Sequence, residues 1–451
     1  MPKKKTALTI EERLQQALVP AEEQPYDVPE NWVWVRLGEV NKYISKSVNP
    51  ISEPDKIFEL YSVPSMTDDY PEIIEGSNIG SSKQSVCKED VLLCKINPRI
   101  NRVWKVSQFT DNELIASSEW IIIRNNNINA DYLMYCFQSK YFREFMLSNV
   151  SGVGGSLMRA QPKYVQKYPI PLPPRSEQQR IVERIEELFA KLDEAKERLQ
   201  EVVDSFAVRK AAILHKAFTG ELTKQWRREN GVSDESWEDV SLGSVCKSIY
   251  DGDHMPPPKS EKGIPFLVIS NVNTGAISFE KCRFVPEEYF NNLSETRTPE
   301  KGDILYTIVG SYGIPVMVDT EQKFCFQRHM ALLKPRSIYN RFLWCQLQTQ
   351  SFFEQATSIA TGTAQLTVPI KGLRKLLIKC PTLPEQHEIV RLIDDLLARE
   401  RSAQQAAEQA LASIELMKKS ILARAFRGEL GTNKASEASA VELLKQVLAE
   451  N

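Results

Sequence analysis

At 451 residues, 42% of them apolar, the chain is long enough to bury more than one core, and its length suggests roughly two to four domains. Its apolar runs are too short to span a bilayer and its N-terminal residues are polar, so we expect a cytoplasmic protein. The net charge of −2 argues only weakly against a nucleic-acid partner, because a sum over the whole chain hides how the charge is distributed.

The cysteines and histidines give little support for a metal site. The chain has eight cysteines, none of them in a Cys-x-x-Cys pair, and only four histidines. We therefore expect reduced, mostly buried thiols, and neither a metal nor a cofactor bound by this chain. Asp251, Asp253 and His254 resemble a metal triad, but no distant partner accompanies them, and a structural or DNA-facing loop is the stronger interpretation.

The first elements in chain order are a short helix and a β-rich domain. Thr9-Ile10-Glu11-Glu12 is typical of a capping box and predicts a helix in the N-terminal arm. Beyond the arm, patterns of apolar residues predict strands at 91–96 and 120–124 and a helix at 130–147. The order of the strands does not follow from the sequence.

Two segments of this domain, 91–110 and 145–176, contain cations and no acidic residue. Arginine to guanine and asparagine to adenine are common base-edge contacts, and lysine suits phosphates. An ordinary solvated surface is the alternative for each segment. The Gly152–Ser156 run lacks a full dinucleotide fingerprint, so a tight turn near a phosphate is the better interpretation. The candidate DNA contacts are Lys95, Asn97, Arg99, Asn101, Arg102, Arg159 and Lys163.

A long helix follows the first domain. Apolar residues from Ile181 to Phe206 recur at steps of four and three, which predicts a heptad seam. Ser176 is expected to cap the N-terminus of this helix, and Gly220 to terminate it. About 40 helical residues at 1.5 Å each correspond to a rod of roughly 60 Å. Such a rod can separate two DNA-reading domains by one helical turn of DNA, roughly 34–36 Å, or more; a stalk without a measuring role is the alternative.

The second domain repeats the plan of the first. Strands are predicted at 266–270, 303–309 and 329–334, and a helix at 341–356. The segments 322–353 and 355–384 are again basic and free of acidic residues. Glu321-Gln322-Lys323 is too close to Asp319 for a nuclease centre, and no amino-methylation motif is present. The candidate DNA contacts here are Tyr306, Ser311, Tyr312, Arg328, His329, Lys371 and Lys375.

The chain is a tandem duplication. Residues 177–222 recur as 385–430 at a constant offset, which a packed helix requires because one inserted residue rotates the following side chains by about 100°. Looser anchors precede the two helices. Trp32, Leu37-Gly38, Asp90-Val91-Leu92 and Ser151-Gly152 correspond to Trp237, Leu242-Gly243, Asp303-Ile304-Leu305 and Thr361-Gly362.

The second helix differs from the first in its middle. Alanines at 403, 407 and 410 occupy the expected seam before Ile414, Met417 and Ile421 resume it, so the two helices can approach closely. Ser439-Ala440-Val441-Glu442 is typical of a capping box, and we expect this tail to lie near the N-terminal arm. The two domains carry the same net charge of +2, since residues 31–175 hold 17 cations against 15 acidic residues and residues 236–384 hold 16 against 14.

We therefore expect an α+β fold: two β-rich α/β domains joined by two long antiparallel helices in a pseudo-twofold, circular arrangement. The expected segments are the arm at 1–30, the first domain at 31–175, the central helix and linker at 176–235, the second domain at 236–384, the second helix at 385–430 and the tail helix at 431–451.

The sequence resembles the specificity subunits of type I restriction-modification systems. Pro169 to Val182 and Ala217 to Thr223 are similar to the central conserved region of that family, and Leu383 to Gln386 with Phe426 to Leu430 to its C-terminal conserved region. The resemblance implies two target recognition domains, each reading one half of an asymmetric bipartite site on double-stranded DNA. It also implies that two methylation subunits using S-adenosylmethionine, and restriction subunits using ATP and Mg²⁺, supply all the catalysis.

Two other classes of function stay open at this point. A scaffold with duplicated protein-binding domains would also show a repeat, and a nuclease or methyltransferase would turn over DNA without any partner. Binding that weakens steeply with salt distinguishes DNA recognition from the scaffold, because phosphate contacts release counterions.

Overall fold

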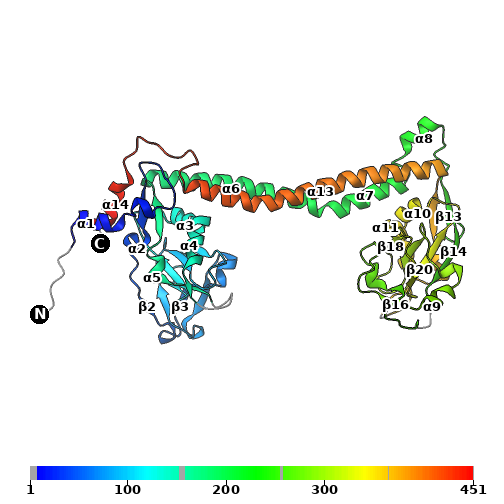
Figure 1. Cartoon of the computed structure of the whole chain (residues 1–451), viewed down its shortest axis with the longest axis horizontal. Helices are drawn as coiled ribbons and strands as arrows, with labels where there is room; N and C mark the ends of the chain where they lie inside the picture. The colour runs from blue at the N-terminus through cyan, green and yellow to red at the C-terminus, as the bar shows by residue number, and fades with distance from the viewer. Residues whose placement is uncertain (1–7, 152–157, 254–256, 364, 450–451) are drawn as a thin grey trace. The chain divides into compact units, whose positions relative to one another are not determined.

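The computed structural model describes residues 8–151, 158–253, 257–363 and 365–449. The chain forms two compact units: unit 1 is made of residues 1–198 and 409–451, and unit 2 of residues 199–408 (Figure 1). Each unit combines one β-rich domain with a stretch of both long helices.

Unit 1 contains short helices and two main sheets. Its helices are α1 (Ile10–Ala17), α2 (Leu37–Val40), α3 (Ala130–Gln138), α4 (Lys140–Ser148), α5 (Pro162–Val165), α14 (Ala440–Ala449), most of α6 (Arg175–Asp204) and the end of α13 (Leu383–Ala425). Its strands are β1 (Val33–Arg36), β2 (Ser47–Val48), β3 (Ile57–Tyr61), β4 (Glu72–Glu75), β5 (Lys83–Ser85), β6 (Val91–Cys94), β7 (Val103–Lys105), β8 (Glu113–Ala116), β9 (Trp120–Ile123), β10 (Val150–Ser151), β11 (Arg159–Ala160) and β12 (Pro169–Leu172). They form sheets of order β2-β5-β8-β3-β4 and β7-β6-β9 and the pairs β1-β12 and β10-β11.

Unit 2 follows the same plan. Its helices are α7 (Phe206–Phe218), α8 (Lys224–Asn230), α9 (Glu287–Asn291), α10 (Asn340–Gln346), α11 (Gln350–Ser358), α12 (Ile370–Leu373) and the first part of α13. Its strands are β13 (Glu238–Ser241), β14 (Cys246–Asp251), β15 (Ile264–Leu267), β16 (Arg283–Val285), β17 (Ile304–Thr307), β18 (Pro315–Met317), β19 (Cys325–Phe326), β20 (Met330–Pro335) and β21 (Leu377–Cys380). They form sheets of order β14-β20-β17-β18 and β16-β15-β19 and the pair β13-β21.

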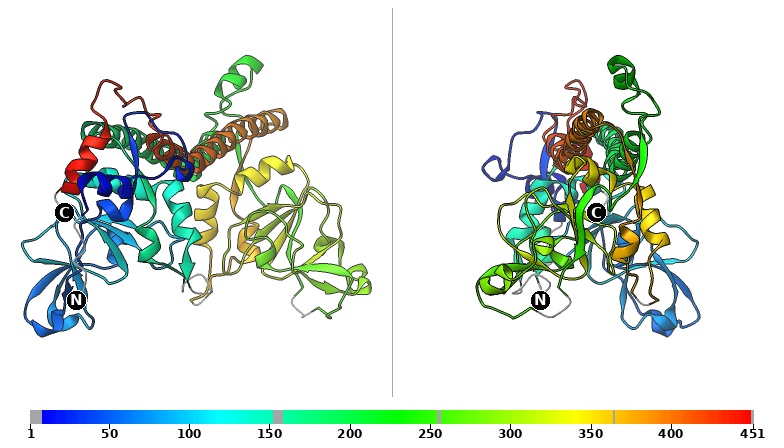
Figure 2. Two further views of the ribbon diagram at one scale, coloured as in Figure 1. Left: turned by 60° about the vertical axis from the view of Figure 1, so that its left-hand side comes forward. Right: turned by 90° about the vertical axis from the view of Figure 1, so that its right-hand side faces the viewer.

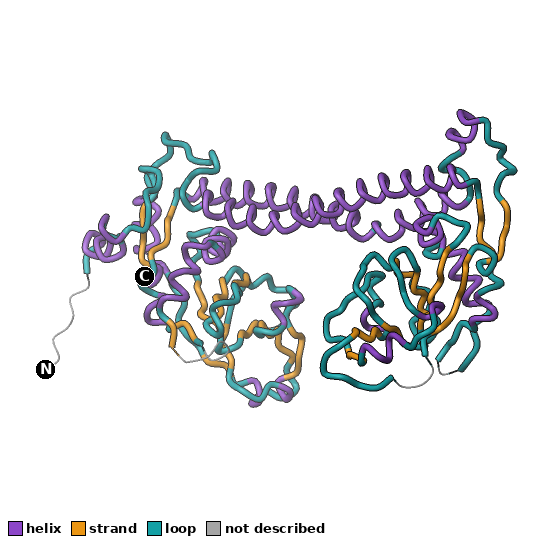
Figure 3. Tube along the Cα trace, turned by 45° about the vertical axis from the view of Figure 1, so that its right-hand side comes forward, coloured by secondary structure: helices purple, strands orange, loops and turns teal. Residues whose placement is uncertain are grey.

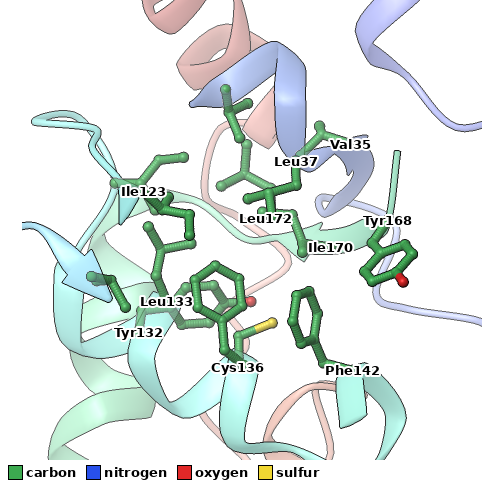
Figure 4. Close-up of a cluster of buried hydrophobic side chains, with 14 of the residues drawn as sticks. Val35, Leu37, Ile123, Tyr132, Leu133, Cys136, Phe142, Tyr168, Ile170 and Leu172 are labelled. Atoms are coloured by element: carbon green, nitrogen blue, oxygen red, sulfur yellow. The ribbon is translucent and has the colours of Figure 1, made fainter. Parts of the chain in front are cut away.

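The largest core of unit 1 lies where α3 and α4 pack against the β1-β12 pair (Figure 4). Tyr132 and Phe142 are fully buried beside Val35 and Ile170. Tyr132 also donates a hydrogen bond from its hydroxyl to the carbonyl oxygen of Pro171 at 2.7 Å, so its polar atom is satisfied. Each such side chain stabilises the fold by about 1.5–3 kcal/mol through burial of apolar surface.

One predicted helix in each unit is divided in two. The expectation of an uninterrupted helix over 130–147, and again over 341–356, is wrong. Ser139 and Thr349 adopt extended backbone immediately before the second helix of each pair. Their hydroxyls accept hydrogen bonds from the N–H groups of Phe142 at 3.4 Å and Phe352 at 3.3 Å, which starts the second helix.

The repeated Leu-Gly pair has a packing reason. The N–H of Gly38 donates to the carbonyl oxygen of Gln166 at 2.7 Å, and the N–H of Gly243 donates to that of Arg374 at 2.9 Å. A Cβ atom on Gly38 would lie 2.9 Å from the same oxygen, and one on Gly243 would lie 3.0 Å away. Only glycine allows the two backbones to approach this closely.

The repeated aspartate before β6 and β17 closes a turn and meets a cation. Asp90 and Asp303 accept the backbone N–H three residues earlier, at 2.8 Å and 2.9 Å. Asp90 pairs with Arg124 at 2.6 Å, and Asp303 pairs with Lys334 at 3.0 Å. Arg124 follows β9, which pairs with β6, and Lys334 lies in β20, which pairs with β17. Each aspartate therefore connects its own strand to the neighbouring strand.

The repeated Glu-Gln pair fastens each domain to the first turn of a long helix. The indole N–H of Trp32 donates to Glu177 at 2.7 Å, and that of Trp237 donates to Glu385 at 3.1 Å. Both carboxylates are fully buried. The neighbouring glutamines, Gln178 and Gln386, accept a loop N–H at 2.8 Å in each unit and donate to the carbonyl five residues earlier.

The two ends of the chain pack together in unit 1, as the sequence predicted. Helices α1 and α14 lie side by side (Figure 2). The predicted capping box at Thr9 is confirmed, because Thr9 and Glu12 exchange hydrogen bonds of 2.8 Å and 3.2 Å. The box predicted at Ser439 is wrong: its hydroxyl accepts the N–H of Val441 at 3.3 Å, and the Glu442 carboxylate faces Lys445.

The long helices lie side by side (Figure 3), and their ion pairs in unit 1 show that they run antiparallel. In unit 1, Asp193 pairs with Lys418 at 2.6 Å, and the later Lys196 faces the earlier Glu415 at 3.9 Å. In unit 2, Arg209 of α7 pairs with Glu400 of α13. Unlike α13, the first long helix is interrupted, since α6 ends at Asp204 and α7 begins at Phe206.

Two details of the helix prediction are wrong. Ser176 does not cap α6, because the helix begins one residue earlier and the N–H groups of the next two residues donate to the Pro174 carbonyl. Ala403 and Met417 are exposed rather than in the seam. Lys418 occupies a seam position instead, with its ammonium 5.1 Å from the centre of the Phe189 ring, because a lysine stem can cover apolar surface.

The cysteines are free thiols, and five of the eight are buried, as predicted. In the described part of the chain, no helix is long and apolar enough to cross a membrane.

Candidate nucleic-acid interface

The loops that follow β6 and β17 have the same backbone frame. Asn97 and Gly310 stand at the same place in the two loops and both adopt left-handed backbone, with φ of 44° and 72°. Their N–H groups donate to the carbonyl oxygens of Met158 at 2.8 Å and Leu366 at 3.0 Å. Side chains that differ are thus presented on one repeated frame.

The unit 1 loop is held from beneath by α3 and α4. The Arg143 guanidinium donates to the carbonyl oxygens of Pro98 and Ile100, and burial lowers the pKa of Arg143 to about 10. The amide of Asn101 donates to the Gln138 carbonyl at 3.0 Å, so this candidate base contact also serves the fold. Arg99 is left exposed between these attachments.

The unit 2 loop is held by aromatic packing. Tyr312 stacks on Phe353, with ring centres 5.5 Å apart and planes 9° apart, and its hydroxyl lies 3.0 Å from the Thr357 hydroxyl. Ser311 is exposed next to it. The prediction that Tyr306 contacts DNA is wrong. Its side chain is fully buried in the core of unit 2 against Phe352.

Matched lysines lie on the short helices α5 and α12 and two residues after each helix ends. Lys163 and Lys371 occupy the same position of the repeat, and so do Lys167 and Lys375. All four are exposed, and within the described ranges none of them has an ion pair with an acidic residue. These lysines are therefore the candidate cations that the structure repeats in both units.

The remaining candidates are dispersed. Arg159 is exposed but pairs with Glu119 at 3.1 Å, which offsets part of its charge. Lys95 and Arg102 are half-buried, and both lie in the loop after β6. Burial, and then the neighbouring Arg328, lower the pKa of His329 below its usual value, so it is neutral at pH 7. Arg328 is exposed in the short connection between β19 and β20.

Two other sequence motifs were the glycine run at 152–156 and the possible metal triad of Asp251, Asp253 and His254. The 152–156 glycine run and His254 lie outside the described residues. Asp253 accepts a hydrogen bond from the Tyr289 hydroxyl at 3.1 Å, and Asp251 lies 3.7 Å from Arg297. Among the described residues, no group of three metal-ligating side chains is present.

Sequence reasoning missed the residues that shape the loops. Arg143 and Phe353 hold the loops of units 1 and 2, but each lies about 40 residues from its loop, and an arginine or phenylalanine in a helix gives no signal of such a contact. Glu119 was also missed, because a single acidic residue outside the basic segments gives no sequence signal for a DNA contact.

Comparison with known proteins places both halves in one family. The family model described as the type I restriction modification DNA specificity domain matches residues 29–204 and 234–410. Similar proteins include the type I restriction enzyme EcoBI specificity subunit of Escherichia coli, 28% identical over 62% of this chain and 64% of that protein. The EcoKI specificity subunit of Escherichia coli strain K12 is 24% identical over 94% of this chain and 96% of that protein.

Solved structures share the fold. The HsdS subunit from Thermoanaerobacter tengcongensis matches with a TM-score of 0.66 at 23% identity, over 90% of this chain and 99% of that one. A chain solved in work on complex assembly and conformational transition of the type I R-M system matches with a TM-score of 0.66 at 22% identity, over 90% and 100% of the two chains. The duplicated domains and long helices are therefore the fold of these proteins, as the sequence predicted.

Proposed function

This chain belongs to the type I restriction modification DNA specificity family, and we propose that each of its units reads one half of a bipartite, asymmetric DNA site. The matched exposed lysines carry this proposal: Lys163 on α5 and Lys167 just after it repeat as Lys371 on α12 and Lys375 just after it. Lysines suit phosphates, which position a protein on DNA without regard to sequence. A cation pair kept in both units fits a duty common to both half-sites.

The loops after β6 and β17 would supply the sequence preference. Arg99 is exposed on the first loop, and Ser311 and Tyr312 lie on the second. Base edges are distinguished by hydrogen-bond donors and acceptors, so different side chains on a repeated frame read different bases. Asymmetry of the DNA site follows, because the two loops share backbone geometry and not chemistry.

The proposal assigns the chemistry to partner chains. Two methylation subunits with S-adenosylmethionine, and restriction subunits with ATP and Mg²⁺, would form a multisubunit adenine methyltransferase and endonuclease around this non-catalytic chain. The long helices would set the spacing of the half-sites and bind the methylation subunits. The proposal also places the protein in the cytoplasm, together with the DNA.

Methylome sequencing of cells that express this chain with its neighbouring methylation subunit tests the proposal. The expected result is a split, asymmetric, adenine-methylated motif that disappears when this chain is deleted. If a verified active partner produces no such motif, the protein-binding scaffold replaces the proposed function.

The phosphate contacts can be tested with matched lysine variants of the full chain. Lys163→Gln with Lys167→Gln, and Lys371→Gln with Lys375→Gln, should each weaken binding to all duplexes alike. Each lost phosphate contact should reduce the slope of log affinity against log salt by about 0.9. Lys224→Gln with Lys419→Gln, two exposed lysines outside α5 and α12, is the control of equal charge and should leave the slope unchanged.

A further inference from the structure

A cavity of about 560 Å³ lies in unit 1 beside the loop that follows β6. We call it the loop pocket. Its lining includes Leu60, Ile96, Asn97, Arg102, Ser117 and Glu119. Apolar side chains with a few polar groups among them are typical of a ligand-binding pocket.

Two residues of the lining each carry a buried hydrogen-bond acceptor that is unsatisfied. Within the described residues, Oδ1 of Asn97 and Oε2 of Glu119 are buried and have no hydrogen-bond partner. The other carboxylate oxygen of Glu119 accepts from Arg159 at 3.1 Å, which orients the group. Leaving a buried acceptor unpaired is costly, so two of them in one pocket call for a ligand that donates hydrogen bonds.

The backbone at Asn97 supports the same conclusion. Its φ of 44° lies in the left-handed region, where a side chain costs more than a hydrogen atom. Unit 2 has Gly310 at the equivalent position, with φ of 72°. Unit 1 therefore carries a side chain where the fold is satisfied by glycine, and that side chain presents an unpaired acceptor. Strain combined with an unmet hydrogen bond is typical of a functional position.

The chemistry of the pocket selects its ligand. Adenine and cytosine present an exocyclic amino group, a donor, in the major groove, whereas guanine and thymine present carbonyl oxygens there. At the acceptors of Asn97 and Glu119 a carbonyl oxygen would be repelled and an amino group would be satisfied, whereas the cationic donors of the lining are Lys83 and Arg102. Building on the proposed function, we infer that the loop pocket reads the amino group of an adenine or cytosine in the half-site of unit 1. Arg102, a donor in the same lining, would suit N7 of adenine.

Selection of bound duplexes from a randomised library by the full chain tests this inference. The wild-type chain should select two half-sites, one with an invariant adenine or cytosine. Asn97→Gly, which copies unit 2 and relieves the left-handed strain, should melt no lower than wild type and yet lose that one preference. Glu119→Gln, which replaces the carboxylate and its unpaired oxygen by an amide, should weaken the same preference. The half-site read by unit 2 is the internal control and should stay unchanged.

An amino-deleted base makes the test quantitative. Replacing the selected adenine by purine, or the selected cytosine by its analogue without the amino group, should weaken wild-type binding by roughly 5- to 150-fold, as for one good base-edge contact. The same replacement should change the affinity of Asn97→Gly by less than about twofold, since the contact is already absent. Whether purine or the cytosine analogue has the effect identifies the base.

The outcomes separate this inference from the proposed function. If the wild-type chain selects no split site, the proposed function fails. If it does select one, and folded Asn97→Gly selects an identical site, the loop pocket is structural and the inference is overturned. A folded variant that loses both half-sites together would also overturn it, because the pocket would then act on binding as a whole.

Discussion

The two units surround the same buried glutamate in different ways. In unit 1 the donors are neutral and are spread over both carboxylate oxygens of Glu177. Trp32 and Asn433 donate to Oε2 at 2.7 Å and 2.9 Å, and the Thr432 hydroxyl lies 3.3 Å from Oε1. The last two come from the tail, residues 426–449, after the second long helix.

In unit 2 the linker, residues 219–236, takes the role of the tail. Trp237, Thr223 and Arg227 all donate to Oε1 of Glu385, at 3.1 Å, 2.7 Å and 2.8 Å. Arg227 is only 7% exposed and pairs with Asp234 as well, at 2.8 Å. The charge of Glu385 is therefore matched by a buried cation that donates directly to it, whereas the hydrogen bonds to Glu177 come from neutral groups and its cationic neighbour, Arg180, acts on it electrostatically.

The difference teaches what the duplication preserves. The acceptor on the helix and the indole from the domain are common to both copies, because each sits inside a repeated element. The other donors come from the connecting segments, which differ in sequence and in their place along the chain. The repeated glutamate is thus bound by neutral donors from the tail in unit 1 and by a cation from the linker in unit 2.

The largest expected effect comes from removing the charge of each glutamate. Glu385→Gln removes the buried one of the two carboxylates that pair with Arg227, and it should reduce the free energy of unfolding of unit 2 by about 3–5 kcal/mol. Glu177→Gln weakens bonds from neutral donors and should cost unit 1 about 1.5–3 kcal/mol. Differential scanning calorimetry measures the two transitions separately. Equal losses of stability in the two units would contradict the distinction between a charged and a neutral set of donors.

A double variant sharpens the same comparison. Adding Arg227→Gln to Glu385→Gln should restore part of the lost stability, because no buried charge then remains unpaired at that contact. A double variant less stable than Glu385→Gln alone would show that Arg227 acts through Asp234 rather than Glu385.

A smaller and symmetrical effect is expected at the shared glycines. Gly38→Ala and Gly243→Ala each push a Cβ against a backbone carbonyl, and each should reduce the melting stability of its own unit by about 1–3 kcal/mol. Gly80→Ala is the control, since no heavy atom lies within 4 Å of its added Cβ, and it should be neutral. Unequal losses at the matched pair would show that the two anchors are not equivalent.

The smallest effect is a pH dependence of the tail. A hydrogen bond from Arg180 lowers the pKa of Glu437 below its usual 4.5. Because the folded pKa is depressed, the pair stabilises unit 1 above pH 4.5, and this contribution is lost as the pH falls through the folded pKa. Glu437→Gln should lower the stability by about 0.2–1 kcal/mol at pH 7.

Melting curves between pH 7 and pH 3 check this prediction. The gap between wild type and Glu437→Gln should close in acid, and a gap that stays constant with pH would assign it to packing. In unit 2 the hydrogen bond from Arg227 likewise lowers the pKa of Asp234 below its usual 3.8, so the contribution of this pair should also be lost as the pH falls through the folded pKa.

The candidate site was less predictable than the fold. Lys163 and Lys371 are exposed where the repeat placed them, since a charged side chain on a short surface helix has few alternatives to solvent. Tyr306 failed because every residue of β17 is buried, and a strand covered on both faces gives no alternation that marks an outward side chain. Asn101 and Arg159 are partly engaged in contacts within the protein that no local pattern announces.

Residue order alone was enough to establish the duplication, the long antiparallel helices and the meeting of the chain ends, because constant spacing and apolar period are local properties that packing must respect. Folding was needed to reveal that Asn433 and Arg227 meet equivalent glutamates, and that Asn97 and Glu119 share a pocket. Those pairs join side chains from segments far apart in the sequence, and only close packing in three dimensions determines which of them come within hydrogen-bond distance.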